Sequence, residues 1–217
     1  MIDGVRIKVC GLTSLVDAEF ADRCGVDYLG FNLYAKSPRY LGLKKFQAMQ
    51  KLLPERKTVA VAVEPTVAEL QEMLAADFDF IQIHFRADTP LATVAGWSAT
   101  AGPDRLWLAP KLPADMDVAA GWLPLAKYFL WDTFDKNAFG GTGRTGDWPK
   151  YARHKAAHPQ NTWILAGGLG PDNIGDALRQ SGANFIDVNS GIETAPGVKD
   201  EAKLRRLIVQ VHEARGA

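Results

Sequence analysis

The chain has 217 residues, 47% of them hydrophobic and 23% charged, a composition that favours one folded domain and excludes a disordered chain. Its 25 basic and 25 acidic side chains cancel, so no basic face indicates nucleic-acid binding. No apolar run approaches the roughly 18 residues of a membrane helix, and the N-terminus lacks a signal-peptide core. The two cysteines, Cys10 and Cys24, form neither a disulfide framework nor a zinc pattern. We therefore expect a cytoplasmic protein with reduced thiols and no metal.

Eight short runs rich in β-branched and aromatic residues recur along the chain, with starts 21 to 34 residues apart. Each run is apolar almost without interruption, as expected of strands that are covered on both faces. The eight predicted strands span residues 7–12, 28–33, 58–63, 80–85, 106–112, 128–133, 162–168 and 185–191.

Segments with helical spacing lie between several of these runs. The spacing predicts helices over 14–24, from the capping box of Thr66 and Glu69 onward, from Pro171 through Leu178, and from Lys203 to the C-terminal segment. Parallel strands need such crossovers. No G-x-G-x-x-G follows the first strand, so a dinucleotide site is not expected. We predict a single (β/α)8 TIM barrel domain over residues 1–217, which fits eight units better than an open sheet does.

In such a barrel, functional residues lie where the strands end at their carboxyl side. Polar residues and glycines stand out there against the apolar runs. They are Cys10, Ser37, Arg39, Glu64, His84, Asp132, Gly167, Gly168, Asp187, Ser190 and Gly191.

Glycine makes the strongest of these signals, because it occurs after both of the last two strands. A glycine lets the backbone approach a phosphate, and backbone N–H groups at helix starts bind anions. Loops seven and eight build the phosphate site in many barrels. We therefore expect phosphate binding, rather than tight turns alone, at Gly167, Gly168, Ser190 and Gly191. The glycine-rich segment 139–146 lacks Walker spacing and is compatible with a substrate cover or a plain connection.

Each single side chain has a structural and a functional interpretation. Cys10 is either a small buried hydrophobe or a reactive thiol, and Cys24 is expected to be inert core within a helix. Asp132 follows an apolar run, where a carboxylate is costly to bury without a role or a partner. His84 is either a satisfied structural histidine or a ligand contact. Arg39 is a surface charge or a fork for a carboxylate.

Eight short motifs carry a family resemblance. The most specific are K-V-C-G-L-T at 8–13, L-A-G-G-L-G-P-D-N at 165–173 and D-V-N-S-G-I-E-T-A-P-G-V-K-D at 187–200. The others are G-F-N-L-Y-A-K-S-P-R-Y at 30–40, V-E-P-T at 63–66, I-Q-I-H at 81–84, W-D-T at 131–133 and G-G-T-G-R-T at 140–145. Together, and in this order, they resemble the phosphoribosylanthranilate isomerase family over nearly the whole chain.

The resemblance implies an Amadori rearrangement in tryptophan biosynthesis, in which an aldose amine becomes a ketose amine without a cofactor. It implies that Cys10 is the general base and Asp132 the general acid, and that Arg39 binds the anthranilate carboxylate. His84 and Asp187 match family positions near the substrate. The expected partner is a small phosphorylated substrate, with no nucleic acid or membrane, and the chain is expected to act as a monomer or homodimer.

The sequence departs from the family pattern at Asn32, at Phe85 and Arg86, and at Gly146. We expect these residues around the barrel mouth, where they would alter loop closure or rate. Two alternatives stay open at this point. One is another phosphosugar isomerase or epimerase barrel, including a bifunctional one, and the other is a non-catalytic barrel that binds a phosphorylated ligand.

Overall fold

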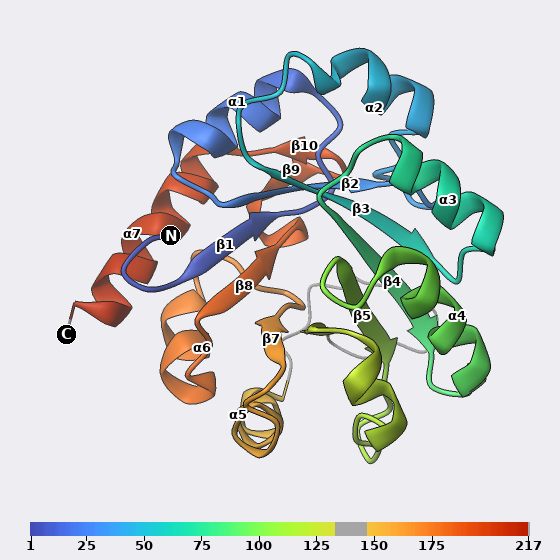
Figure 1. Ribbon diagram of the computed structural model, residues 1–217. Coiled ribbons are helices and arrows are strands. Elements are labelled where there is room, and N and C mark those ends of the chain that lie inside the picture. Colours follow the sequence, from blue (N-terminus) through green and yellow to red (C-terminus); the bar gives the residue numbers. More distant parts are fainter. Residues whose placement is uncertain (133–146, 217) are drawn as a thin grey trace.

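The computed structural model describes residues 1–132 and 147–216, and its eight parallel strands close into a barrel (Figure 1). The first and last strands of the barrel are hydrogen-bonded to each other, because β1 pairs with β2 on one side and with β8 on the other. The predicted (β/α)8 fold is thereby confirmed. The strands are β1 (Arg6–Val9), β2 (Tyr28–Asn32), β3 (Lys57–Val63), β4 (Phe80–Arg86), β5 (Leu106–Lys111), β6 (Tyr128–Trp131), β7 (Thr162–Leu165) and β8 (Phe185–Val188).

Several strands end earlier than the apolar runs predict. β1 ends at Val9, β7 at Leu165 and β8 at Val188. Cys10, Gly167 and Gly168 therefore lie in loops after their strands, and Ser190 and Gly191 lie in a short 3-10 helix that follows β8. The glycine-rich segment 139–146 and Thr133 lie outside the described residues.

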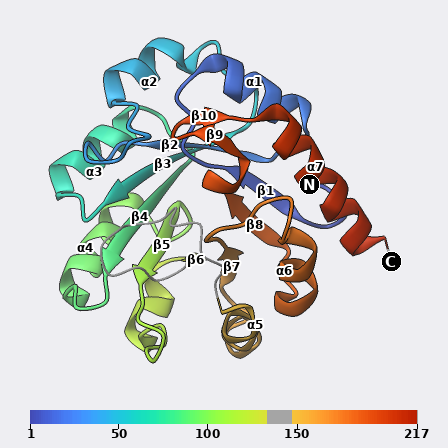
Figure 2. The ribbon, with the colours of Figure 1, turned by 180° about the vertical axis from the view of Figure 1, so that it is seen from behind.

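Helices form an outer ring around the barrel (Figures 1 and 2). The capping box of Thr66 and Glu69 is confirmed at the start of α3, and Ser14 caps α1 by accepting from the N–H of Asp17. The fifth crossover contains a 3-10 helix with Pro124 inside it rather than an α-helix. The elements are α1 (Leu15–Arg23), α2 (Leu43–Gln50), α3 (Val67–Ala75), α4 (Leu91–Ala101), η1 (Ala120–Leu125), α5 (Trp148–Ala157), α6 (Ile174–Ser181), η2 (Ser190–Ile192) and α7 (Glu201–Arg215).

Two details of the predicted helices are wrong. Helix α6 begins at Ile174 and not at Pro171, because Asn173 closes the preceding loop: its amide donates to Gly168 O and accepts from Gly170 N. Cys24 is not inside a helix but is the half-buried C-cap residue of α1. Within the described part of the chain, no helix is long and apolar enough to cross a membrane.

A short hairpin after β8 was not predicted from the sequence. Strands β9 (Glu193–Ala195) and β10 (Val198–Lys199) pair antiparallel. The hairpin lies beside the ends of β1 and β2 in both views (Figures 1 and 2). Thr13, in the loop after β1, fastens it by donating to Gly197 O at 2.6 Å.

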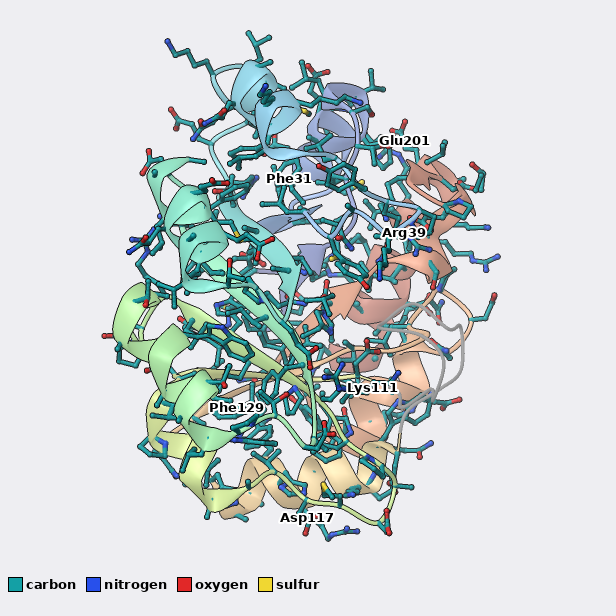
Figure 3. All side chains as sticks on the ribbon, turned by 90° about the vertical axis from the view of Figure 1, so that its right-hand side faces the viewer. Phe31, Arg39, Lys111, Asp117, Phe129 and Glu201 are labelled. Carbon is teal, nitrogen blue, oxygen red and sulfur yellow. The ribbon has the colours of Figure 1, made fainter. Side chains whose placement is uncertain are left out.

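The apolar core has two layers. One lies between the strands and the helices, where Phe31 packs edge-on against Phe46, which stacks on Phe78 with ring centroids 3.8 Å apart. Phe31 and Phe129, on opposite sides of the barrel, belong to this layer (Figure 3). The other layer fills the barrel interior with Tyr28, Phe80, Trp107, Tyr128 and Phe185.

Pleating of the strands then positions the site above this aromatic floor. Successive side chains of a strand point to opposite faces, so residues two apart share the barrel interior. On β4, Phe80 packs in the floor, and Gln82 and His84 above it line a cavity. On β6, Tyr128 packs in the floor, and Leu130 and then Asp132 line the same cavity. Along β4 and β6, the inward-facing side chains thus change from apolar in the floor to polar at the cavity.

Candidate active site

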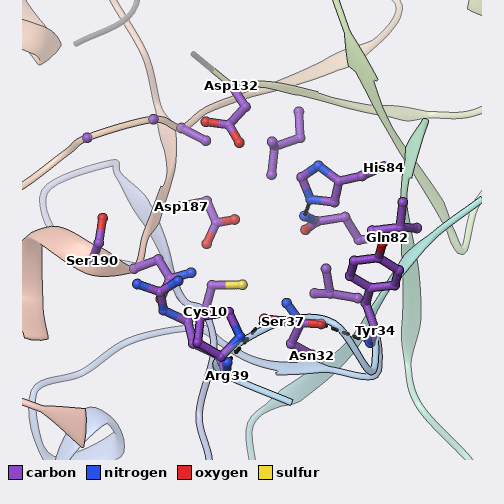
Figure 4. Close-up of a pocket in the computed structure, with 18 of the residues that line it drawn as sticks. Cys10, Asn32, Tyr34, Ser37, Arg39, Gln82, His84, Asp132, Asp187 and Ser190 are labelled. Carbon is purple, nitrogen blue, oxygen red and sulfur yellow. Dashed lines mark hydrogen bonds between the residues drawn. The ribbon is translucent and has the colours of Figure 1, made fainter. Parts of the chain in front are cut away.

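A cavity of about 500 Å³ opens at the carboxyl ends of the strands (Figure 4). It brings together residues from all parts of the chain. Of the strand-end residues without a predicted role, Ser37 lines it and Glu64 does not. All but one of the residues with a predicted catalytic or binding role line it. Those that do are Cys10, Arg39, His84, Asp132, Gly167, Gly168, Asp187 and Ser190. The exception, Gly191, packs directly behind the wall against Leu169 and Gly170.

Cys10 lies at the base of this cavity, just beyond the end of β1. Its backbone N–H donates to Val188 O at 2.9 Å, which ties it to the end of β8. Burial raises the pKa of the Cys10 thiol above its ordinary value, and the charge of Asp187 acts in the same direction. Lys8 opposes both effects by charge and by hydrogen bonding. In Figure 4, Cys10 and Asp132 lie on opposite sides of the cavity, with Asp187 between them in this view.

Asp187 forms an ion pair inside the barrel with Lys8, Nζ to Oδ2 at 2.9 Å. Burial alone would lower the pKa of the Lys8 ammonium, but Asp187 and Cys10 outweigh burial, so its pKa lies above the ordinary value. The second carboxylate oxygen of Asp187, Oδ1, is buried and has no hydrogen-bond partner among the described residues. It is therefore available as an acceptor for a ligand in the cavity.

His84 is a neutral group in this site. Burial, with a smaller effect from the charge of Lys8, lowers its pKa to about 3. Its Nε2 lies 2.8 Å from Nε2 of Gln82, so the histidine accepts if the amide donates. Oε1 of Gln82 is then a second buried acceptor without a partner among the residues described. Sequence analysis quoted Gln82 within the I-Q-I-H match but gave it no role, although its polar side chain stands out between Ile81 and Ile83.

Arg39 is held by Glu193 from the β9–β10 hairpin. Nε of Arg39 donates to both carboxylate oxygens, at 2.9 and 3.1 Å, and Nη2 donates to Oε2 at 2.7 Å. These bonds use the Nε edge of the guanidinium, and no residue of the described ranges bonds to its Nη1 side, which can therefore take a ligand. Arg39 is thus a partly buried, oriented fork and not a surface charge.

The carboxylate of Glu193 has further partners on the hairpin. Lys199 Nζ lies 2.7 Å from its Oε1, and the N–H of Gly197 donates to the same oxygen. Although burial would raise the pKa of Glu193, Arg39 and Lys199 more than compensate, so its pKa lies below the ordinary value. Sequence analysis quoted the segment containing Glu193 and Lys199 but gave neither a role.

The loops after β7 and β8 meet at glycines. A Cβ at Gly191 would lie 2.1 Å from Leu169 O, so only glycine permits this approach. Gly167 and Gly168 have φ values of +85° and +62°, in the region that favours glycine. The two loops therefore present backbone to the cavity, as a phosphate-binding wall requires.

Other residues that the sequence placed at the mouth lie elsewhere. Phe85 points away from the cavity and packs between Trp97 and Trp122. Arg86 is exposed, and its guanidinium pairs with Glu64 at 3.0 Å, outside the cavity. The expectation that Phe85 and Arg86 lie around the cavity mouth is therefore wrong.

Two further departures have different outcomes. Asn32 does line the cavity, and its Oδ1 accepts from the N–H of Tyr34 at 2.9 Å. Gly146 lies outside the described residues.

Comparison with known proteins supports one family. Residues 7–210 match the family described as N-(5'phosphoribosyl)anthranilate (PRA) isomerase. The Aquifex aeolicus N-(5'-phosphoribosyl)anthranilate isomerase is 34% identical over 206 residues, covering 94% of this chain and 97% of the relative. The solved phosphoribosyl anthranilate isomerase of Thermus thermophilus superposes with a TM-score of 0.79 at 27% identity, covering 96% of this chain and 99% of that one.

A further solved structure adds a ligand complex. It is a phosphoribosyl anthranilate isomerase in complex with reduced 1-(o-carboxyphenylamino)-1-deoxyribulose 5-phosphate. Its TM-score is 0.71 at 24% identity, with 98% of this chain and all of that chain covered, so this likeness bears on the fold.

Proposed function

Because the chain belongs to the N-(5'-phosphoribosyl)anthranilate isomerase family, we propose that its cavity performs the family reaction with Cys10 as general base and Asp132 as general acid. The protein is an aldose–ketose isomerase of tryptophan biosynthesis. Its substrate is N-(5'-phosphoribosyl)anthranilate, and its product is 1-(2-carboxyphenylamino)-1-deoxyribulose 5-phosphate. The observation that carries the assignment of roles is the arrangement of Cys10 and Asp132 on opposite sides of one cavity (Figure 4).

The order of strands in the closed barrel puts the proposed phosphate-binding loops between Asp132 and Cys10. β6, β7, β8 and β1 are consecutive around the barrel. The loops after β7 and β8 therefore lie on the arc between Asp132 and Cys10. A ribose anchored there by its 5-phosphate reaches over the mouth with one flank toward each residue. This placement suits a reaction that needs an acid at the ring oxygen and a base at C2.

Each proton that the substrate gains in this reaction is matched by one that it loses. Asp132 gives a proton to the ring oxygen, and the sugar opens to an iminium that keeps its N–H. The Cys10 thiolate takes the proton from C2, which neutralises the iminium and yields the enolamine. Ketonisation then adds a proton at C1 and removes one from the hydroxyl at C2. The proton that passed from Asp132 to Cys10 returns through solvent, and no electron leaves the substrate.

The remaining polar groups suit the remaining parts of the substrate. The Nη1 side of Arg39 is available for the anthranilate carboxylate. Asp187 Oδ1 and Gln82 Oε1 are buried acceptors of the kind that ribose hydroxyls need. His84, which is neutral, contributes a hydrogen bond rather than a charge. Gly167, Gly168, Ser190 and Gly191 bind the phosphate through backbone N–H groups.

Replacing Arg39 by alanine is expected to reduce kcat/KM by an amount equivalent to roughly 2–4 kcal/mol of transition-state stabilisation. The substitution leaves no unpaired buried charge, because Glu193 keeps Lys199 and the N–H of Gly197. Arg39→Lys should recover only part of the loss, since lysine cannot hold Glu193 and a ligand carboxylate with one planar fork. Steady-state kinetics of the three proteins measure this, and unchanged kcat/KM in Arg39→Ala would refute the assignment.

A side chain at Gly191 should weaken phosphate binding, because it must push the loops after β7 and β8 apart. We expect Gly191→Ala to raise the inhibition constant of inorganic phosphate, used as a competitive inhibitor, by at least about tenfold. Gly96→Ala on α4 is the control, since a Cβ there meets nothing within 4 Å. Equal inhibition constants in wild type and Gly191→Ala would remove these loops from the phosphate site.

Complementation tests the activity in vivo. The gene should restore growth without tryptophan to a bacterial strain that lacks this isomerase, and a Cys10→Ala, Asp132→Asn double variant, produced at equal level, should not. Failure of the wild-type protein to complement while it is folded and abundant would count against the function. This outcome would favour a different phosphosugar isomerase or a non-catalytic phospholigand-binding barrel.

We further propose that residues 1–217 act as one catalytic domain in the cytoplasm, as a monomer or homodimer. Neutral net charge supports the absence of a nucleic-acid partner, and a redox-neutral rearrangement needs no cofactor. One solved structure shows monomers generated from a phosphoribosylanthranilate isomerase of Thermotoga maritima that is described as dimeric. Sedimentation of the purified protein decides between the two oligomeric states.

A further inference from the structure

Lys8 lies inside the barrel, where no mechanism described above uses it. Its side chain is fully buried between the aromatic floor and the cavity, with Nζ 6.0 Å from the Trp107 ring centroid. Gly30 on β2 leaves space for this side chain because it has no Cβ: a Cβ there would lie 2.8 Å from Lys8 Cε and 3.0 Å from Nζ. A buried ammonium is costly unless it is paired with anionic groups, so its partners explain its presence.

Two acidic groups share this single ammonium. One is the carboxylate of Asp187, whose Oδ2 lies 2.9 Å from Lys8 Nζ. The other is the thiol of Cys10, a residue whose Cα lies beside the same ammonium next to Gly30. Cys10 and Lys8 lie two residues apart along the same run, and Cys10 lines the cavity while Lys8 lies below it. Lys8 Nζ and Cys10 Cα lie 3.0 and 3.1 Å from the point that a Cβ of Gly30 would occupy, so the ammonium and the cysteine are close neighbours below the cavity.

We propose that Lys8 is a positioning residue whose buried charge makes the thiolate form of Cys10 available for catalysis, and that Asp187 competes with Cys10 for this charge. The proposal rests on the base role of Cys10 in the proposed function. When the thiolate takes the C2 proton it becomes a neutral thiol, and Lys8 is left paired with Asp187. The charge on the sulfur thus disappears in the same step that neutralises the iminium.

The other charged groups near Cys10 do not replace Lys8. Lys199, from the hairpin, lowers the pKa of the thiol less than Lys8 does, and its ammonium is already paired with Glu193. Arg39 is likewise paired with Glu193. His84, across the cavity on β4, stays neutral. Asp187, on β8, raises the pKa of the thiol by its own charge.

The test measures the thiolate directly, so that it does not depend on activity. In a Cys24→Ala background Cys10 is the only cysteine, and its alkylation by iodoacetamide is followed as a function of pH. Lys8→Met should raise the midpoint of alkylation by at least about one pH unit, as expected for loss of an adjacent opposite charge. The rising limb of the kcat/KM profile should move to higher pH by the same amount.

A matched control is Lys150→Met. Lys150 is also a buried lysine, but its ammonium donates to Ala114 O and Met116 O beside α5, away from the cavity. Its loss tests the general effect of removing a buried ammonium and should leave the alkylation midpoint unchanged. Lys8→Met with a wild-type midpoint would overturn the proposal and leave Lys8 a structural residue.

Asp187→Asn gives the opposite sign and serves if Lys8→Met does not fold. It removes a negative charge and leaves the ammonium to Cys10, so the alkylation midpoint should fall by at least about one pH unit. An unchanged or higher midpoint would overturn the proposal. If Cys10→Ala abolishes turnover but neither midpoint moves, the role of Lys8 fails while the base role of Cys10 stands. If the midpoints move but Cys10→Ala retains turnover, Lys8 still controls the thiol, but the base role of Cys10 in the proposed function fails.

Discussion

Cys10→Ala should lower kcat by at least about a hundredfold, the lower range for losing one general acid or base. The sulfur lines the cavity, and no other thiol does. Alanine keeps the backbone and removes only Sγ, so the hydrogen bond from Cys10 N to Val188 O is retained. KM should change little, because the phosphate and the anthranilate carboxylate bind elsewhere in the cavity. Steady-state turnover of the substrate by the purified variant, with circular dichroism to verify folding, measures the effect.

Cys24→Ala controls for the loss of a thiol. Cys24 is the half-buried C-cap residue of α1 and does not line the cavity, so its removal should leave kcat near wild type. A folded Cys10→Ala variant with nearly normal kcat would mean that the cysteine is structural. The proposed mechanism would then fail.

Asp132→Asn should reduce kcat to a similar extent, by at least about a hundredfold, because asparagine keeps the shape of the side chain but is no acid. Asp132 follows β6 and lines the cavity on the side opposite Cys10 (Figure 4). Without it, the ring oxygen must take its proton from water, and opening of the sugar should become rate-limiting. Turnover of the variant under substrate saturation measures this.

The control for this carboxylate is Asp172→Asn. Asp172 is exposed in the loop before α6 and pairs with Arg206, away from the cavity. It should retain normal kcat. If Asp132→Asn does the same while Cys10→Ala does not, the acid is another group and Asp132 only lines the site.

The barrel and most of the site follow from local patterns in the sequence. Apolar runs at regular spacing marked the strands, and the rule that function lies at their carboxyl ends led to Cys10, His84, Asp132 and Asp187. The same alternation also identifies Lys8 and Gln82, to which sequence analysis gave no role. Lys8 precedes Cys10 by two positions, as Gln82 precedes His84, so strand alternation places each of these pairs on the inner face.

Alternation also explains the error at Phe85. Since His84 faces the interior, its neighbour must face the helices, where Phe85 meets Trp97 and Trp122. The pairing of Arg39 with Glu193 is different. These residues are 154 positions apart and meet only because the β9–β10 hairpin returns to the barrel mouth. No local pattern contains that contact.

The proposed site is tested most directly by a crystal structure of this protein with a product analogue, reduced 1-(o-carboxyphenylamino)-1-deoxyribulose 5-phosphate. We predict that its phosphate accepts from the backbone N–H groups of Gly168, Ser190 and Gly191, and that its carboxylate contacts Arg39. C2 of the sugar should then lie toward the Cys10 sulfur, with the oxygen derived from the ring toward Asp132. A phosphate bound away from the loops after β7 and β8, or a sugar out of reach of Cys10, would contradict the proposed site and its mechanism.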